Sequence, residues 1–279
     1  MKTSNKLLTA LAALLIIIPI IVVAVNVKIN YRPTNGDSFV EEQEINAEPF
    51  DTESSGRTSI PIKTPFHSVN IPDAKRIYLE LHFIKSAKSG VKVPTDMKNG
   101  INFSVSSTGA LQINFGDKLN RSGNHRNGIV ILVYSPDIDE LNLNNSSNLV
   151  LTAKTDTLNV NLKKSGSLSF GSPITFSNEK TTKIINQTDI KQLNVNLDSA
   201  VFYSRINSYK NLNISCKNSS VSIHADEQES ISIGNLTINT FGKSDVKIEN
   251  AIVSKISGSL SDETTIAMPV KYLKQMLKN

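Results

Sequence analysis

The side chains that could bind a metal or transfer protons are scattered along this chain. Asp226-Glu227-Gln228-Glu229 is the densest carboxylate cluster in the part of the chain expected to fold, and carboxylate oxygens are ligands that calcium prefers. The cluster lacks the Asp-x-Asp-x-Gly pattern of a calcium loop, so we expect a solvated loop. His67, His82, His125 and His224 show no spacing typical of a zinc site. The sequence therefore predicts no metal site and no cofactor.

Cleavage of a polysaccharide would need paired carboxylates, or a carboxylate beside a basic residue, on one face of the protein. Asp189, Asp245 and Glu249 are isolated in the sequence, and Asp198 with Arg205 is the best candidate pair. We therefore predict no catalytic residues and favour a binding protein. The alternative is a polysaccharide-active enzyme, a lyase or hydrolase, on a β-helix scaffold.

A regular series of polar residues offers different chemistry. Each member stands between two apolar residues; the series is Asn142, Asn159, Asn194, Asn213 and Thr237. If successive segments stack in register, these residues form a polar stripe with steps of about 4.8 Å. Its amides could hydrogen-bond sugar hydroxyls or the strand edge of a partner. Alternatively, the stripe keeps the face soluble and hydrogen-bonds only to itself.

The apolar residues around the stripe predict the elements that carry it. Apolar side chains at positions i and i+2 share one face of a strand. The predicted core is Leu141, Leu143, Leu158, Val160, Leu193, Val195, Leu212, Ile214, Leu236 and Ile238. Weaker copies begin at Ile174 and Ile252, and a second alternating segment follows each copy after a small, polar corner such as Ser165-Gly166-Ser167 or Ser257-Gly258-Ser259.

A unit of two short strands cannot bury its apolar face alone, whereas stacked copies can. The sequence thus predicts an all-β protein with a parallel β-solenoid, resembling a β-helix, over residues 136–268. In residues 57–135 apolar and polar residues also alternate, but without the regular unit length of the later segments. They predict an irregular antiparallel β cap, with a hairpin at Ser106–Gly109. Residues 269–279 have a short helical pattern that could close the other end.

The N-terminal region predicts a membrane anchor. Residues 7–25 are almost uninterrupted in apolarity and long enough to cross a bilayer as a helix. Lys2 and Lys6 precede them, which favours a cytoplasmic N-terminus and a periplasmic or cell-surface remainder. We assign residues 1–32 to this anchor or uncleaved signal and residues 33–56, rich in Asp and Glu, to a flexible linker. Secretion after signal cleavage is the alternative.

The composition of the chain limits the classes of partner that we expect it to bind. The formal net charge is +5, but the basic residues are spread and no aromatic residues interleave with them, so we expect no nucleic acid partner. An envelope polysaccharide or a protein ligand fits better. Cys216 is the single cysteine, which excludes an intramolecular disulfide and predicts a small buried residue.

Two motifs resemble a known family. They are Thr64-Pro65-Phe66-His67-Ser68-Val69, before a long strand, and the stretch from Val133 to Leu143, which includes Ser135-Pro136-Asp137 and leads into the repeats. Over about residues 60–265 the chain resembles the autotransporter-adhesin head GIN domain, common in envelope proteins of Bacteroidota. The resemblance implies an extracytoplasmic β-solenoid with an adhesive role and no catalytic residues. We therefore expect a membrane-anchored, non-catalytic, adhesin-like binding protein of the cell envelope.

Overall fold

The computed structural model describes residues 6, 11, 14, 15, 17–23, 25, 48–117, 119, 128–171, 174–177, 182–185, 187–225 and 230–278. The chain forms two compact units, residues 1–44 and 45–279. In the first unit, residues 17–23 are helical. Within the described ranges, no helix has both the length and the apolarity needed to cross a membrane. The predicted transmembrane segment, residues 7–25, falls partly outside these ranges.

The second unit is mainly β-structure, so the all-β prediction is confirmed. Its strands are β1 (Arg57–Pro61), β2 (Ser68–Ile71), β3 (Tyr78–Lys85), β4 (Gly90–Pro94), β5 (Ile101–Val105), β6 (Ala110–Phe115), β7 (Ile129–Ser135), β8 (Glu140–Asn144), β9 (Asn148–Lys163), β10 (Ser167–Phe170), β11 (Ile174–Ser177), β12 (Thr182–Ile185), β13 (Asp189–Asp198), β14 (Val201–Ser204), β15 (Tyr209–Lys217), β16 (Ser220–His224), β17 (Ile231–Phe241), β18 (Asp245–Glu249), β19 (Ala251–Ser259) and β20 (Thr265–Ala267). A 3-10 turn, η1 (Lys98–Gly100), precedes β5, and helix α4 (Val270–Met276) follows β20.

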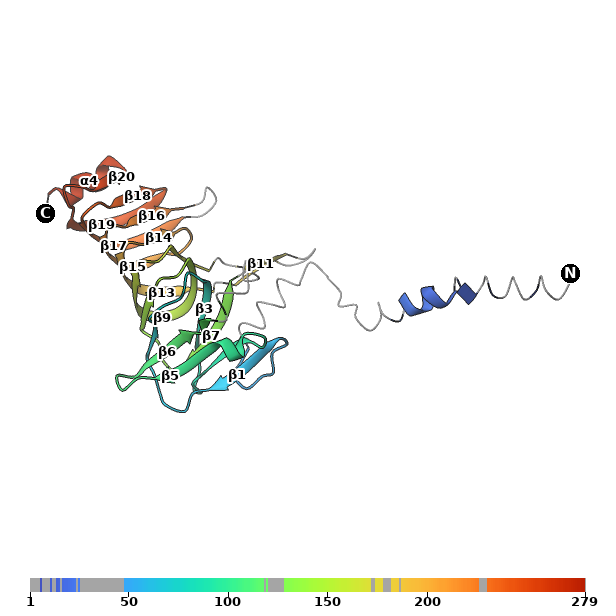
Figure 1. Cartoon of the computed structure of the whole chain (residues 1–279). Helices are drawn as coiled ribbons and strands as arrows, with labels where there is room; N and C mark the ends of the chain where they lie inside the picture. Colours follow the sequence, from blue (N-terminus) through green and yellow to red (C-terminus); the bar gives the residue numbers. More distant parts are fainter. Residues whose placement is uncertain are drawn as a thin grey trace. The chain divides into compact units, whose positions relative to one another are not determined.

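The strands pair into two columns. Column A runs β1-β4-β7-β3-β9-β10-β14-β16-β18-β20, and column B runs β5-β6-β2-β8-β9-β13-β15-β17-β19. The long strand β9 contributes its first half to column A and its second half to column B. From β8 onward the chain alternates between a strand of column B and a strand of column A, and the pairs stack in chain order (Figure 1). We call each such pair a coil.

The core lies between the two columns. Leu158, Leu193, Leu212 and Leu236 are direct neighbours in adjacent strands of column B. The ten side chains expected to line the core are each at most 2% exposed. Cys216 is free and buried, as predicted, and burial raises the pKa of its thiol. The inward rows of aliphatic side chains therefore form one continuous core along the coils.

The corner from column B to column A contains a left-handed residue in five successive coils. One residue in each corner has positive φ: Asn145 at 58°, Lys164 at 47°, Ser199 at 60°, Asn218 at 48° and Gly242 at 63°. A left-handed residue turns the chain sharply, and Asn and Gly adopt this conformation at low cost. Because Asn145 and Lys164 begin equivalent corners, the number of residues between them sets the length in sequence of one coil.

Buried serines follow these left-handed residues, directly at Ser146, Ser165 and Ser219 and after one further residue at Ser244. The Ser146 N–H donates to the Ser165 Oγ at 3.2 Å, and the Ala200 N–H donates to the Ser219 Oγ at 3.1 Å. The Ser219 hydroxyl in turn donates to the Lys217 carbonyl at 2.6 Å. Ser244 occupies the same place in the next coil, where its Oγ accepts from the Ser219 N–H at 3.4 Å. The hydroxyls of Ser165, Ser219 and Ser244 thus satisfy backbone groups that the corner removes from the ladder, whereas the buried Ser146 hydroxyl has no such partner.

Three details of the predicted repeat are wrong. Residues 174–177 form an antiparallel pair, β11–β12, instead of a coil. Leu141 pairs with Val160, and not with Leu158, because the corner residues set a longer step. Ile252 is 59% exposed, and Ile256 pairs with Leu236 in its place. In β19, Ser254 and Lys255 are both exposed. The strict alternation of inward and outward side chains is therefore broken at this point, which we call a parity change, and the residues before and after it do not follow one period of two.

The predicted corner Ser257-Gly258-Ser259 also lies inside a strand, β19. Gly258 has φ of 138°, and a Cβ there would lie 1.8 Å from the Ile238 carbonyl oxygen. Glycine is needed at this position because a neighbouring backbone passes close by. At Gly166, which does stand in a corner, a Cβ would lie 1.5 Å from the Ser147 carbonyl oxygen.

Residues 57–135 are only partly the antiparallel cap that the sequence predicts. The pairs β1–β4, β4–β7 and β5–β6 are antiparallel, including the predicted hairpin. However, β2 pairs in parallel with both β6 and β8, and β3 pairs in parallel with both β7 and β9. The coil β2–β3 is thus inserted between coil β6–β7 and coil β8–β9, out of chain order.

A buried lysine holds the end of the segment predicted as a linker. Lys92 is fully buried, and its ammonium donates to the Pro49 carbonyl at 2.9 Å and to the Thr52 carbonyl at 2.8 Å. The Tyr134 hydroxyl donates to the Glu48 carbonyl at 2.9 Å, and Phe50 packs edge-on against the Tyr134 ring. Residues 48–54 therefore pack against β4 and β7.

Candidate functional site

The outward side chains of column B form three parallel rows, because its strands pair in register. Row 1 is Thr157, Gln192, Asn211, Asn235 and Lys255; row 2 is Glu140, Asn159, Asn194, Asn213, Thr237 and Ser257; row 3 is Gln112, Asn70, Asn142, Asn161, Asn196, Ser215, Asn239 and Ser259. We call the surface made by these rows the amide face. Its members repeat with the strand spacing of about 4.8 Å.

The predicted stripe is divided between two of these rows. Asn159, Asn194, Asn213 and Thr237 share row 2. Asn142 instead lies in row 3 beside Asn161, since the coil step moves β8 by two residues relative to the predicted register. Such a shift keeps every leucine on the inward face, because side chains alternate with a period of two. Apolar periodicity alone could not have detected it.

Within the rows, the amides hydrogen-bond to one another in a single direction. In row 2 the Asn194 Nδ2 donates to the Asn159 Oδ1 at 2.7 Å, and the Asn213 Nδ2 donates to the Asn194 Oδ1 at 2.8 Å. In row 3 the Asn196 Nδ2 donates to the Asn161 Oδ1 at 2.7 Å. Row 1 contains the same contact between Asn235 and Asn211 at 2.8 Å. Each donor points to the preceding coil.

These contacts leave hydrogen-bonding capacity unused. An Asn side chain has two N–H donors and an oxygen with two lone pairs. Within the row Asn194 uses one donor and one lone pair and Asn213 uses one donor, so a further donor and a further lone pair of each can face outward. The rows hold the amide planes in fixed orientations before any ligand arrives, which lowers the entropy lost on binding. The amide face is thus a preorganised array of alternating donors and acceptors.

A groove follows row 3 along the amide face. Its volume is about 430 Å³, and its lining includes Asn70, Asn142, Asn161, Asn196 and Ser215. Leu143 and Leu162 form part of its apolar wall. Sequence reasoning missed row 3, although its signal is visible: Asn161 and Asn196 follow Asn159 and Asn194 by two residues. In Leu-Asn-Val-Asn-Leu, both asparagines point to the same outward face.

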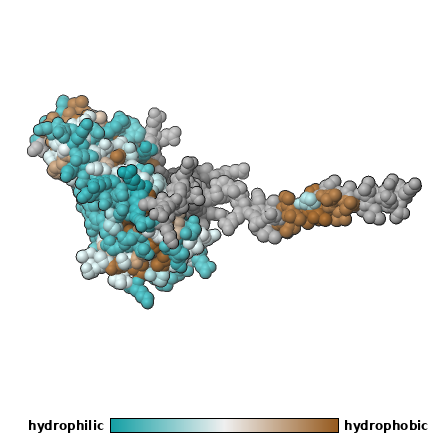
Figure 2. Space-filling model, viewed as in Figure 1, coloured by the Kyte–Doolittle hydropathy of each residue, from teal (hydrophilic) through white to brown (hydrophobic). Residues whose placement is uncertain are grey.

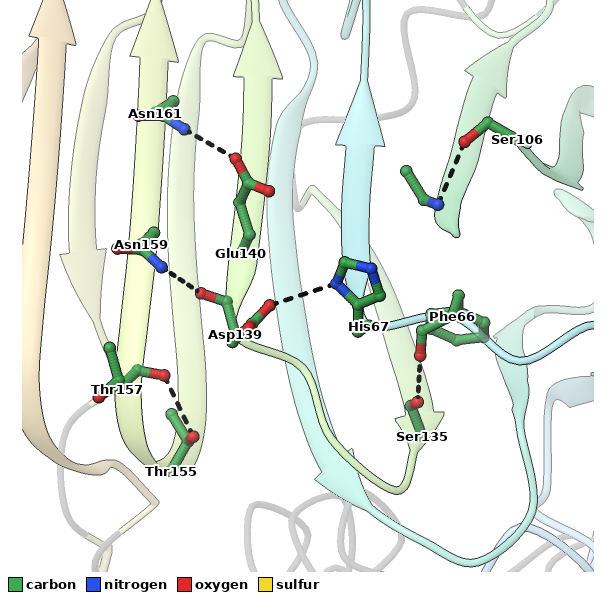
Figure 3. Close-up of polar contacts among 11 residues, drawn as sticks. Phe66, His67, Ser106, Ser135, Asp139, Glu140, Thr155, Thr157, Asn159 and Asn161 are labelled. Carbon is green, nitrogen blue, oxygen red and sulfur yellow. Dashed lines mark hydrogen bonds and ion pairs between the residues drawn. The ribbon is translucent and has the colours of Figure 1, made fainter. Parts of the chain in front are cut away.

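The amide face meets charged groups where coil β8–β9 begins (Figure 3). The Asn159 amide donates to the Asp139 backbone carbonyl at 3.1 Å, and the Asn161 amide donates to the Glu140 carboxylate at 3.3 Å. The Asp139 carboxylate lies 3.5 Å from the His67 Nδ1. These charged groups end the neutral part of row 2 on this side, so the uncharged surface extends from Asn159 toward the C-terminal coils.

A second, charged cleft lies where β9 bends between the columns. Its volume is about 610 Å³, and it is lined by residues from β3, β9, β13 and the segment 135–139. Asp156 and Lys191 form an exposed ion pair there at 2.5 Å. The hydrogen bond from Lys191 lowers the pKa of Asp156 and raises that of Lys191. A general acid in glycoside hydrolysis needs the opposite shift in its carboxyl pKa.

The other candidate chemical groups are separated. The Asp198 carboxylate accepts from the Ser199 hydroxyl at 3.1 Å, whereas the Arg205 guanidinium lies over the Tyr203 ring. His82 is buried between Glu80 and Thr152, and His224 lies 3.5 Å from Glu249. His125 and the cluster at residues 226–229 are outside the described residues. Within the described part of the chain, no three His, Cys, Asp or Glu side chains converge as metal ligands would.

Comparison with known proteins gives the following relatives. The sequence model of a family described as "Putative auto-transporter adhesin, head GIN domain" matches residues 76–259. Among solved structures, a "putative adhesin" from Bacteroides fragilis NCTC 9343 is 13% identical with a TM-score of 0.38, covering 77% of this chain and 94% of that one. A "putative adhesin" from Parabacteroides merdae ATCC 43184 is 13% identical with a TM-score of 0.33, covering 76% and 94%. A "putative lipid binding protein" from Parabacteroides distasonis ATCC 8503 is 13% identical with a TM-score of 0.30, covering 77% and 98%. No curated protein matches the chain.

Proposed function

This chain belongs to the family of auto-transporter adhesin head GIN domains, and from that premise we propose that it is a non-catalytic, adhesin-like binding protein of the bacterial envelope. We further propose that its coils form a parallel β-solenoid and that its ligand is an uncharged stretch of envelope polysaccharide. The observation that carries the proposal is the preorganised amide face, whose rows of Asn194 and Asn213 keep free donors and acceptors.

The chemistry of the amide face favours a sugar polymer. Sugar hydroxyls both donate and accept hydrogen bonds, as the outward groups of an Asn amide do. The central members of row 2, from Asn159 to Thr237, carry no charge, so binding there requires no ion to lose its hydration. In the view of Figure 2 the surface over the middle coils is largely hydrophilic. A polymer lying along the rows could repeat the same contacts in successive coils.

Placement in the envelope is the second part of the proposal. Residues 7–25 would hold the chain in the lipid bilayer, and the acidic segment that follows would separate the head from the membrane, with the bulk of the chain periplasmic or on the cell surface. The apolar run with Lys2 and Lys6 before it supports this topology. Secretion after cleavage of the N-terminal segment is the alternative topology.

A polysaccharide-active enzyme is the alternative function, and the charged cleft at the bend of β9 is where it would act. Two of the carboxylates in that cleft have basic partners: Asp156 is paired with Lys191 and Asp139 lies beside His67. The lowered pKa of Asp156 makes it a poor proton donor. We therefore favour binding over cleavage.

Labelled oligosaccharides added to spheroplasts that carry the full chain would test the proposal. We expect neutral oligosaccharides to bind and protease treatment of intact spheroplasts to abolish the signal. Asn194→Thr with Asn213→Thr should weaken binding by about tenfold or more, because two amides lose their outward groups. Threonine already occupies row 2 at Thr237, so the fold should accept it.

The matched control places the same substitutions on the other column. Ser169 and Ser222 alternate with the inward core residues of column A and therefore point outward. Ser169→Thr with Ser222→Thr should leave binding unchanged. Equal binding by the row 2 variant and the parent protein would refute the amide face as the binding site. New reducing ends or unsaturated products would instead establish the enzyme.

A further inference from the structure

The two columns of strands have four edges, and three of them are protected. At the C-terminal end of column B, α4 covers β19: the Tyr272 hydroxyl donates to the Ala251 carbonyl at 2.8 Å and accepts from the Val253 N–H at 3.0 Å. The Gln275 side chain accepts from the Ile256 N–H at 3.2 Å. At the same end of column A, β20 is only three residues long. Helix cover and short edge strands both discourage further strand pairing.

The N-terminal edges differ from each other. Column A ends at β1, which contains Arg57 and Pro61, and charge and proline both disfavour the addition of a strand. Column B ends at β5, with the sequence Ile-Asn-Phe-Ser-Val. It contains neither charge nor proline, and among the described strands it pairs only with β6. Within the described ranges, β5 is therefore the one edge strand that lacks these protections.

The backbone groups that β5 offers can be identified from its pairing. Just beyond its ends, the Ser106 N–H donates to the Ala110 carbonyl at 2.9 Å and the Gly116 N–H donates to the Gly100 carbonyl at 2.8 Å. Hydrogen-bonded residues alternate along an antiparallel strand, so Asn102 and Ser104 face β6. The N–H and carbonyl groups of Phe103 and Val105 therefore point away from β6, along the open edge, and those of Ile101, a residue that is only 3% exposed, point in the same direction.

The side chains of β5 add an apolar component to this edge. Ile101 is 3% exposed, and Phe103 and Val105 are partly buried against the core. Phe103 therefore keeps apolar surface exposed at the last strand of the column. Figure 2 shows apolar residues gathered toward the two ends of the stack. A further strand beside β5 would cover this surface and satisfy the open backbone groups together.

We infer that β5 pairs with β5 of a second copy of this chain, in antiparallel orientation about a two-fold axis at Phe103. In this register Ile101 faces Val105 of the second copy and Phe103 faces its own equivalent, so all the open backbone groups find partners. On the other face of the strand, Asn102 meets Ser104 of the second copy. No like charges meet within the paired strands, and the aromatic pair adds packing.

A second copy fits this edge better than an unrelated strand does, because the sequence is self-complementary at this register. The symmetric arrangement is closed, so it yields a dimer and not a fibre. It would join the two B columns into one continuous sheet and extend the amide faces of both copies across the axis. The inference does not depend on the identity of the ligand of the amide face.

Cysteine cross-linking of the full chain in detergent tests the register. Asn102 and Ser104 are exposed, whereas the native Cys216 is buried. Residues directly opposite lie within disulfide reach, and diagonal neighbours about 7–8 Å apart lie beyond it. A mixture of the Asn102→Cys and Ser104→Cys chains should therefore give a disulfide-linked dimer after oxidation. Each variant alone should give none.

A charged variant tests the dimer without new covalent bonds. Ser104→Lys should convert the dimer to a monomer by light scattering while its circular dichroism stays unchanged, because lysine on an edge strand blocks pairing. Ser232→Lys, at an exposed position of β17, is the matched control and should remain dimeric. A monomeric parent protein, a dimer that persists in Ser104→Lys, or equal cross-linking of Asn102→Cys alone would each overturn the inference.

Discussion

The coils from β8 onward stack in chain order, whereas the coils before β8 are interleaved. In the C-terminal region each coil contacts the coils immediately before and after it in sequence, as β15 does with β13 and β17. In the N-terminal region β3 lies between β7 and β9, and β2 lies between β6 and β8. The same parallel pairing thus arises from local contacts in one region and from distant contacts in the other.

This difference shows what a repeat contributes. In the C-terminal region, similar corners place each new coil on the last, so sequence neighbours become spatial neighbours. In the N-terminal region, residues 72–77 separate β2 from β3, and a still longer stretch of sequence separates β6 from β7, where the C-terminal region has short corners. Longer connections do not fix the step between coils, and the chain can leave a gap that a distant coil occupies. Pairing over such distances slows folding because loop closure costs entropy.

Truncating a core leucine in each region should have the largest effect on stability. The two truncations should also show that the regions differ in which strands contact each other. Leu81 in β3 and Leu212 in β15 are both fully buried. Each change to alanine should lower the free energy of unfolding by about 2–5 kcal/mol, because it removes buried methyl groups and leaves a cavity. Hydrogen exchange should then differ between the variants. Leu212→Ala should weaken protection in β13 and β17, its neighbours in sequence order.

Leu81→Ala should instead weaken protection in two segments on opposite sides of the coil, β7 and the first half of β9. Leu81 pairs with Ile131 in β7 and with Leu151 in β9. If exchange in β7 stayed at the parent rate while exchange in β9 rose, the interleaved order would be wrong. A loss of protection confined to β3 itself would contradict both arrangements.

Substitution of a corner serine should lower the stability by less than the leucine truncations do. The effect should be specific to the C-terminal region, where the coils stack in chain order. Ser219→Ala removes the acceptor of the buried Ala200 N–H and the donor to the Lys217 carbonyl. We expect a loss of about 1–3 kcal/mol in unfolding free energy, measured by urea denaturation. Ser222→Ala, on an outward face, is the control and should change it by less than about 0.5 kcal/mol.

The reverse change, Ala200→Ser, should complete the row of corner hydroxyls. Ala200 is the corner residue that interrupts the serines at Ser165 and Ser219, so the repeat places the Ser165 N–H opposite it. A hydroxyl there should add about 0.5–1 kcal/mol of stability. A destabilised Ala200→Ser protein would show that this corner does not repeat the geometry of its neighbours.

Sequence reasoning predicted the features that depend on local periodicity. The inward leucines and the hairpin before Gly109 follow from alternation and from turn residues. The step between coils did not follow, because shifting Leu141 by two residues leaves its inward face unchanged. The parity change that exposes Ile252 comes from two consecutive outward residues, Ser254 and Lys255, inside β19. The coil step leaves no signature in apolar spacing, whereas the parity change has one: Val253 and Ile256 are both buried and stand three residues apart, as Ile233 and Leu236 do.

The interleaving of β2–β3 was unpredictable for a different reason. It depends on which distant strands pair, as when Val69 pairs with both Leu111 and Leu141. Any apolar inward residue satisfies such a pairing, so the sequence carries no signal for it. The amide face was predictable in its chemistry from Asn194 and Asn213, whereas the division of the stripe into rows required the register.

The last predicted effect concerns a feature of the N-terminal region, the contacts of Lys92 and Tyr134 with residues 48–54, which we call the clamp. Burial raises the pKa of Tyr134 to about 12, above its ordinary value of 10.0. The folded protein therefore keeps this proton between pH 10 and about 12, where the unfolded chain loses it. Stability from this group is fully present below pH 10 and falls as the pH rises through that window.

Tyr134→Phe removes both this titration and the hydrogen bond to the Glu48 carbonyl. At pH 7 the free energy of unfolding of the variant should be lower than that of the parent protein by about 0.5–1.5 kcal/mol. The difference should shrink as the pH rises above 10, because only the parent protein loses the contribution of the protonated hydroxyl. Burial lowers the pKa of Lys92 in the same clamp, but both proteins retain that lysine, so the difference between their urea midpoints isolates Tyr134. A difference that stays constant from pH 7 to pH 11 would mean that the hydroxyl is accessible to solvent and that residues 48–54 do not seal the outer face of β7.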